Sequence, residues 1–124
     1  MNAGYRYLPD VDVHALDCGG HLTLELGLGR LRALEHALAE RPARDGVHKL
    51  LIDFRETRFD SDETHRALSI ATRSTLGLAR QNAAIHVAFV HPNGYGAVSG
   101  SEAWFRTETE ALDWLDRSEG ATSD

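Results

Sequence analysis

One run of apolar residues constrains the fold of this chain more than any other feature. Residues 47–54, Val-His-Lys-Leu-Leu-Ile-Asp-Phe, are almost continuously apolar and follow the turn sequence Asp45-Gly46. A strand with one face in water alternates apolar and polar residues, whereas a strand covered on both faces does not. The run therefore predicts a central strand of a largely parallel sheet.

The residues before this strand predict an opening strand pair and a helix. Residues 5–8 and 11–16 alternate in side-chain character, as half-buried strands do, and the turn residues between them favour an antiparallel pair. The leucines at 24, 28, 31, 34 and 38 recur at helical spacing. They predict a first amphipathic helix that ends before Pro42. Its polar side is expected to hold most of Arg30, Arg32, Glu35 and His36.

The residues after the central strand predict two more strands and two more helices. A capping box at Asp60 and Glu63, or Ser61 as a competing cap, starts a helix that runs to about Ala79. An apolar strand follows at residues 84–90 and a short one at 103–106. Thr107 and Glu110 then form the capping box of a terminal helix.

This order of elements predicts an α/β fold, with a mixed, mostly parallel sheet of about five strands and helices packed on it. We assign residues 1–117 to this domain and residues 118–124 to a flexible tail. Only about eleven glycine-rich residues, 91–101, join the last two strands, and a parallel connection normally needs a dozen or more. We therefore expect a shortened or missing crossover helix, a last strand that pairs differently or at an edge, and a homodimer that covers the exposed side.

Composition and charge narrow the classes of function. The chain has 124 residues, a net charge of −6 and scattered arginines, which argues against a nucleic-acid partner. We expect no membrane span and a cytoplasmic location, because no apolar run reaches the length that a span requires. The lone Cys18 cannot form an internal disulfide; it is a packing residue or, alternatively, a reactive thiol.

Three motifs resemble those of a known family. They are residues 20–23 (Gly-His-Leu-Thr), 49–55 (Lys-Leu-Leu-Ile-Asp-Phe-Arg) and 104–115 (Trp-Phe-Arg-Thr-Glu-Thr-Glu-Ala-Leu-Asp-Trp-Leu). Together with the layout, they resemble the SpoIIAA-like branch of the STAS superfamily, which includes the anti-sigma-factor antagonists. In the antagonists, a serine at the corresponding helix start is phosphorylated by a partner kinase, and Asp60-Ser61 fall at a similar place. Here two acidic residues follow Ser61, where the antagonists usually have a small residue and a glycine.

This resemblance implies a non-enzymatic domain that acts through contact with a protein partner. The expected contact surface is the loop and helix start at residues 55–63, with Arg55, Arg58, Asp60 and Ser61 as contact residues. The same four residues also fit a plain reading, in which Ser61 caps the helix and the arginines belong to a solvated ion-pair cluster.

The alternative function is a module that binds a small apolar ligand or a lipid. The helix at residues 64–79 is rich in small hydroxyl residues, which together with the short 92–101 connection predicts a cleft between sheet and helix. SpoIIAA-like domains also resemble lipid-exchange proteins in topology. Phe59, His91 and Tyr95 are the residues that we expect around this crevice.

No motif supports a metal, a cofactor or a catalytic set. His86 and His91 bracket a strand end but point to opposite faces, and the glycines at 94, 96 and 100 lack the spacing of a dinucleotide loop. Ser61 and Ser99 have no nucleophile-elbow context. An enzyme would need a perturbed acid or base near His91 and Asp53.

Overall fold

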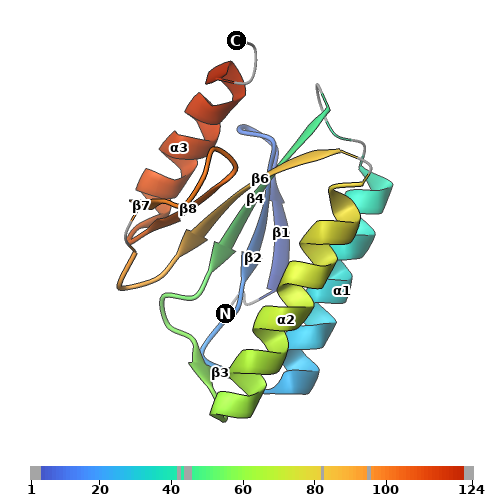
Figure 1. Cartoon of the computed structure of the whole chain (residues 1–124), viewed down its shortest axis with the longest axis vertical. Coiled ribbons are helices and arrows are strands. Elements are labelled where there is room, and N and C mark those ends of the chain that lie inside the picture. Colours follow the sequence, from blue (N-terminus) through green and yellow to red (C-terminus); the bar gives the residue numbers. More distant parts are fainter. Residues whose placement is uncertain (1–3, 42, 44–45, 82, 95, 122–124) are drawn as a thin grey trace.

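The computed structural model describes residues 4–41, 43, 46–81, 83–94 and 96–121 (Figure 1). Within these residues the main sheet has six strands, in the order β1-β2-β4-β6-β8-β7. The inner strands are mutually parallel, and each edge strand is antiparallel to its neighbour. The α/β class and the mixed, mostly parallel sheet are thus confirmed. The strands are β1 (Gly4–Leu8), β2 (Val13–Asp17), β4 (Val47–Asp53), β6 (Ala84–Val90), β7 (Gly96–Ala97) and β8 (Glu102–Phe105).

Helices cover both faces of this sheet. Helices α1 (Leu24–Glu40) and α2 (Asp62–Ala79) lie side by side on one face, and α3 (Glu108–Ala121) packs on the other (Figure 1). The hydroxyl of Thr107 accepts a hydrogen bond from the amide of Glu110 at 3.2 Å, which confirms the predicted cap of α3. Helix α3 continues into the segment predicted as a tail, whose residues 122–124 lie outside the described ones.

Strand β4 occupies the centre that its sequence predicts. It pairs in parallel with β2 on one side and with β6 on the other. Leu50 and Ile52 belong to the core under α1 and α2, whereas Leu51 belongs to the core under α3, and all three are at most 2% exposed. Each such side chain contributes about 1.5–3 kcal/mol when fully buried. The side chains of this one strand therefore contribute to both cores.

The connection between β6 and β8 replaces a crossover helix with a strand. Its described residues form β7 and turns, so the expected loss of a helix is correct for that part of the connection. The expectation that the last strand lies at an edge is wrong, because β8 pairs with β6 and β7 simultaneously. Gly94 allows the chain to reverse here, since a Cβ at this position would lie 2.3 Å from the carbonyl carbon of Phe105.

Two very short strands form a second sheet below the carboxyl ends of the main strands. These are β3 (His21–Leu22), after β2, and β5 (Arg58–Phe59), after β4, and they pair in parallel. The amide of Arg58 donates to the carbonyl of Gly20 at 2.6 Å, and the amide of Asp60 donates to that of Leu22 at 3.1 Å. The loops after two neighbouring strands are thus held together as one unit.

Helix α2 packs closely against α1 at Gly27. A Cβ at Gly27 would lie 2.5 Å from both methyl carbons of the Leu68 side chain, whereas nothing lies within 4 Å of a Cβ at Gly29. Gly27 is buried and Gly29 is exposed. The two glycines, which look equivalent in the sequence, therefore have opposite roles.

We expect alanine to have opposite effects at these two positions. Gly29→Ala should raise the free energy of unfolding by about 0.5–1 kcal/mol, because it removes backbone freedom from the unfolded chain at an open helical site. Gly27→Ala should lower it by about 1–3 kcal/mol, because Leu68 must move within a packed core. Urea denaturation of both variants measures the difference, and equal shifts would contradict the close approach of the helices.

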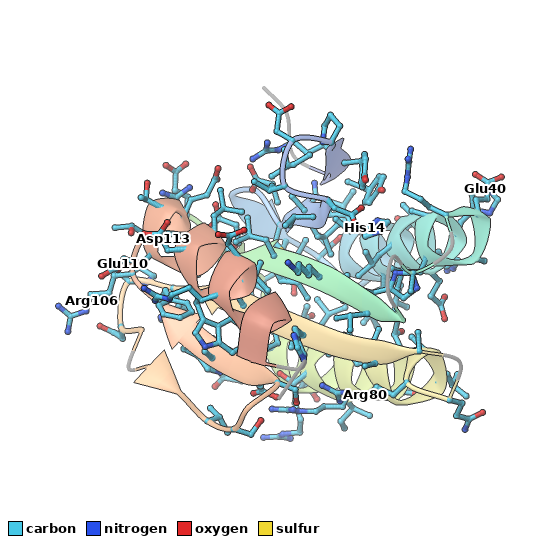
Figure 2. The ribbon with its side chains drawn as sticks, turned by 90° about the horizontal axis from the view of Figure 1, so that it is seen from above. His14, Glu40, Arg80, Arg106, Glu110 and Asp113 are labelled. Carbon is cyan, nitrogen blue, oxygen red and sulfur yellow. The ribbon has the colours of Figure 1, made fainter. Side chains whose placement is uncertain are left out.

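Two buried histidines lie at the amino-terminal ends of the parallel strands. His14 on β2 and His48 on β4 are 3% and 8% exposed, and their ring centroids are 5.6 Å apart. The Tyr5 hydroxyl is 2.9 Å from Nδ1 of His14. Figure 2 shows His14 on the side of the sheet that faces α1, away from α3 with its labelled Glu110 and Asp113. Burial and, next, the neighbouring His48 lower the pKa of His14 to about 4.

This lowered pKa predicts acid sensitivity. The unfolded chain binds a proton at His14 below about pH 6.5, whereas the folded chain does not until about pH 4, so folding stability falls as the pH drops through this window. The variant His14→Phe keeps an aromatic ring there and should lose less stability between pH 7.5 and pH 5 than the native chain, by roughly 1–3 kcal/mol. Denaturation at both pH values tests this.

The matched control for this experiment is His36→Gln. His36 lies on α1 with a side chain that is 74% exposed, beside Glu40. Its replacement should change the free energy of unfolding by about 0.5 kcal/mol or less at either pH, because an exposed pair of this kind contributes little. An unchanged pH dependence in His14→Phe would show that the buried ring does not remain neutral in the folded chain.

Candidate functional site

A cleft opens at the carboxyl ends of the parallel strands, between the sheet and helices α1 and α2. Its volume is about 580 Å³. In Figure 1 this end of the molecule is the lower one, where β3 and the first turns of both helices lie. The lining comes from the sheet, from both helices and from the loops after β2, β4 and β6. The cleft thus occupies the place where ligands dock in open α/β sheets.

Three aromatic side chains, Phe54, Phe89 and Trp104, line the sheet side of this cleft. Together they are called the aromatic floor. Phe89 and Trp104 occupy paired positions of β6 and β8, and their rings stack with centroids 4.4 Å apart and planes 17° apart. The ring of Phe54, just after β4, lies 6.2 Å from that of Phe89 at an interplanar angle of 11°. Strand alternation puts all three on the face of α1 and α2.

The short β3–β5 sheet supplies a second wall. Thr57 and Phe59 line the cleft from the loop after β4. The hydroxyl of Thr57 donates to the carbonyl of Gly19 at 2.8 Å. The ring of Phe59 stacks on that of His65, at the start of α2, with centroids 4.4 Å apart. These contacts join the loop both to β3 and to α2, so the wall is fixed from two sides.

Two arginines line the cleft from the helices. Arg73 on α2 is paired with Glu102 on β8, with Nη1 and Oε1 2.9 Å apart. Burial raises the pKa of Glu102, but the hydrogen bond and positive charge of Arg73, with smaller contributions, outweigh it and the net pKa is lowered. Arg30 on α1 donates from Nη1 to the carbonyl oxygen of Cys18. Arg30 therefore does not lie on the polar side of α1 as predicted, because its side chain is half-buried and lines the cleft.

Cys18 is a packing residue. It is 5% exposed within the core under α1 and α2, and it also borders the cleft. Burial raises the pKa of its thiol to about 12, although Arg30 acts in the opposite direction. The nucleophilic form of cysteine is the thiolate. Cys18 is therefore a neutral thiol at physiological pH, and the packing interpretation is the one that the structure favours.

The three residues expected around the crevice divide into two groups. Phe59 and His91 both line the cleft, from β5 and from the loop after β6. The imidazole of His91 is held in its loop by the amide of Asn93, which donates to Nδ1 at 3.0 Å. Tyr95 lies outside the described residues. The crevice predicted from the sequence is thus present at two of its three positions.

The four residues expected to contact a partner do not share one surface. Arg55 donates from Nη2 to the carboxylate of Asp53 at 2.7 Å and lies 3.8 Å from that of Glu108 on α3. Strand alternation places Asp53 on the α3 face, away from the cleft and from His91. Arg58, Asp60 and Ser61 are exposed beside the cleft wall. The partner contact through residues 55–63 stays a prediction.

Ser61, and not Asp60, caps helix α2. Its hydroxyl accepts a hydrogen bond from the amide of Thr64 at 3.0 Å. The capping box predicted at Asp60 and Glu63 is therefore wrong, and the competing cap at Ser61 is confirmed. The amide of Asp60 donates to the carbonyl of Leu22, which holds this residue beside β3, just after the end of β5.

We expect this cap to contribute measurably to stability. Ser61→Ala should lower the free energy of unfolding by about 1 kcal/mol, whereas Ser61→Asp should remain close to the native value, because aspartate caps helices equally well. Urea denaturation compares the two. The control Ser74→Ala, at an exposed position within α2, should not destabilise the chain. A loss in Ser61→Asp as large as in Ser61→Ala would argue against capping.

Comparisons with models of known families, with curated proteins and with solved structures find no match for this chain. Among the described residues, no group of three His, Cys, Asp or Glu side chains is placed to hold a metal ion. The helices that the structure describes include none with the length and apolar character needed to cross a membrane. The function must therefore be argued from the cleft itself.

Proposed function

We propose that this protein is a binding module for a small, largely apolar organic molecule, held in the cleft between the sheet and helices α1 and α2. The observation that carries this proposal is the 580 Å³ cleft with its aromatic floor of Phe54, Phe89 and Trp104. Pockets for small molecules commonly measure about 300–1,000 Å³ and have mostly apolar walls with a few polar groups. The cleft has both properties.

The floor favours a ligand with flat or extended apolar parts. Its rings are nearly parallel, and Phe54 and Trp104 are inclined by only 17° to each other. Stacking on such rings contributes about 0.5–1.5 kcal/mol beyond the burial of apolar area. Leu22, Leu31, Leu68 and Leu76 supply the apolar surface opposite and beside the rings. An apolar body can therefore be enclosed on several sides.

The chemistry of the lining supports binding without catalysis. The one cysteine at the cleft carries a neutral, buried thiol. Asp53, the carboxylate considered as an acid or base partner of His91, is engaged by Arg55 on the other face of the sheet. We accordingly propose a non-enzymatic role, and no cofactor is part of it.

The partner-contact function expected from the sequence stands second. The cleft wall has three exposed neighbours, Arg58, Asp60 and Ser61. A protein that contacts them would lie next to any ligand in the cleft. A STAS-like, SpoIIAA-like domain, a cytoplasmic location and a homodimer are parts of the same proposal. Its support is the order of strands and helices, which follows the expected layout except for β3, β5 and β7.

We expect the purified protein to bind the neutral fluorescent probe N-phenylnaphthylamine saturably. Ser69→Phe should weaken this binding by about tenfold or more, because Ser69 lines the cleft and a phenyl ring there occupies ligand volume. Ser74→Phe is the matched control, since Ser74 is also exposed on α2 but does not line the cleft. Fluorescence titration measures both affinities.

Two outcomes of this titration would overturn the ligand proposal. One is the absence of saturable binding by the native chain. The other is an equal loss of affinity in Ser69→Phe and Ser74→Phe, which would place the probe elsewhere. Alanine substitution of Arg58 and Ser61, followed by pull-down, tests the partner proposal separately, because neither residue lines the cleft.

A further inference from the structure

The charges around the cleft are unbalanced. Among the described residues that line it, two carry a permanent positive charge, Arg30 and Arg73, and none is an aspartate or a glutamate. The charge of Arg73 is compensated by Glu102, which does not itself line the cleft. The carboxylate oxygens of Glu102 lie 2.9 Å and 3.3 Å from the two terminal nitrogens of Arg73. The uncompensated charge of the cleft is therefore that of Arg30.

Arg30 is held in place by a neutral group. Its Nη1 donates to the carbonyl oxygen of Cys18, and within the described residues no carboxylate lies at ion-pair distance from it. The Cys18 main chain is itself fixed, because its amide donates to the carbonyl of Asp53 at 3.0 Å. A guanidinium has five N–H donors in a rigid fork, so most of its donors remain for another group.

A half-buried guanidinium in this position favours an anion. A cationic ligand would be repelled, and a neutral one would displace water from Arg30 without supplying a negative charge. A carboxylate or sulfonate instead gains charge-assisted hydrogen bonds from the guanidinium fork. A single uncompensated arginine matches one negative charge better than a multiply charged phosphate group.

Arg30 and the aromatic floor are held at different parts of the sheet, so they can bind different parts of one ligand. Arg30 is anchored at the end of β2, whereas Trp104 lies on β8, and β4 and β6 separate these two strands. The aromatic rings nevertheless gather at one place, because the ring centroids of Phe54 and Trp104 are only 6.4 Å apart. The floor is therefore one compact cluster, with the ring of Phe89 6.2 Å from that of Phe54 and 4.4 Å from that of Trp104.

We infer that the ligand of this cleft is an organic monoanion, with its acidic group bound by Arg30 and its apolar body packed against Phe54, Phe89 and Trp104. This inference rests on the proposed binding function and names the chemical class of its ligand. Arg30 is the residue that selects acids over neutral molecules of the same shape. The aromatic floor binds both kinds.

Two probes with the same aromatic body test this inference: anilinonaphthalene sulfonate, an anion, and the neutral N-phenylnaphthylamine. The native chain should bind the sulfonate about tenfold more tightly than the neutral probe. Arg30→Gln should reduce the ratio of the two affinities to about one, and this ratio is the quantity that tests the role of Arg30. Arg32→Gln, at an exposed position on the same helix, should change neither affinity.

Further measurements guard against a misfolded variant. Arg30→Lys should retain part of the preference, because it keeps the charge but not the fork. In the native chain, dodecanoate should displace the neutral probe at lower concentration than dodecanol does, which requires no variant. The sulfonate affinity should fall with added salt more than the affinity for the neutral probe.

The possible failures are distinguishable. Saturable binding of the neutral probe together with an equal affinity for the sulfonate would overturn the inference and leave the proposed function standing. A preference for the sulfonate that survives in Arg30→Gln would also overturn the role of Arg30. If neither probe binds saturably, the proposed function and the inference both fall.

Discussion

The burial of β4 on both faces is the constraint on which the other elements depend. Its backbone pairs with β2 and β6, and its side chains alternate between the core under α1 and α2 and the core under α3. A strand in this position must have helices on both sides, because neither face can be left to water. The loops that follow β2, β4 and β6 then gather at one edge, and that edge forms the cleft.

The sequence predicted the larger elements well because their signals are periodic. The leucine spacing of α1 and the apolar runs of β4 and β6 extend over many residues. Burying these apolar residues in the core stabilises the same helix and strands that their spacing predicts. The two-residue strands β3, β5 and β7 have no such period, and only long-range pairing creates them. Within the site, Phe59 and His91 could be predicted from their place after strands, because loops at this edge converge.

Arg30 shows why the rest of the site could not be predicted. It follows Gly27 by three residues and precedes Leu34 by four, and both of these are buried, so it borders the apolar stripe of α1. This spacing is a usable signal for a flanking position. Whether a flanking arginine points to water or to a cleft depends on the second helix and on the carbonyl of Cys18, neither of which lies nearby in the sequence.

The contact of Gly27 with Leu68 has a consequence for how such a domain can diversify. Because Gly27 has no side chain, Leu68 of α2 can pack directly against the backbone of α1. Both residues line the cleft. A bulkier residue at position 27 would act as a spacer between the helices and alter the depth of the site. Ligand size and ligand charge would then be adjustable separately, one through a glycine and the other through an arginine one turn further along.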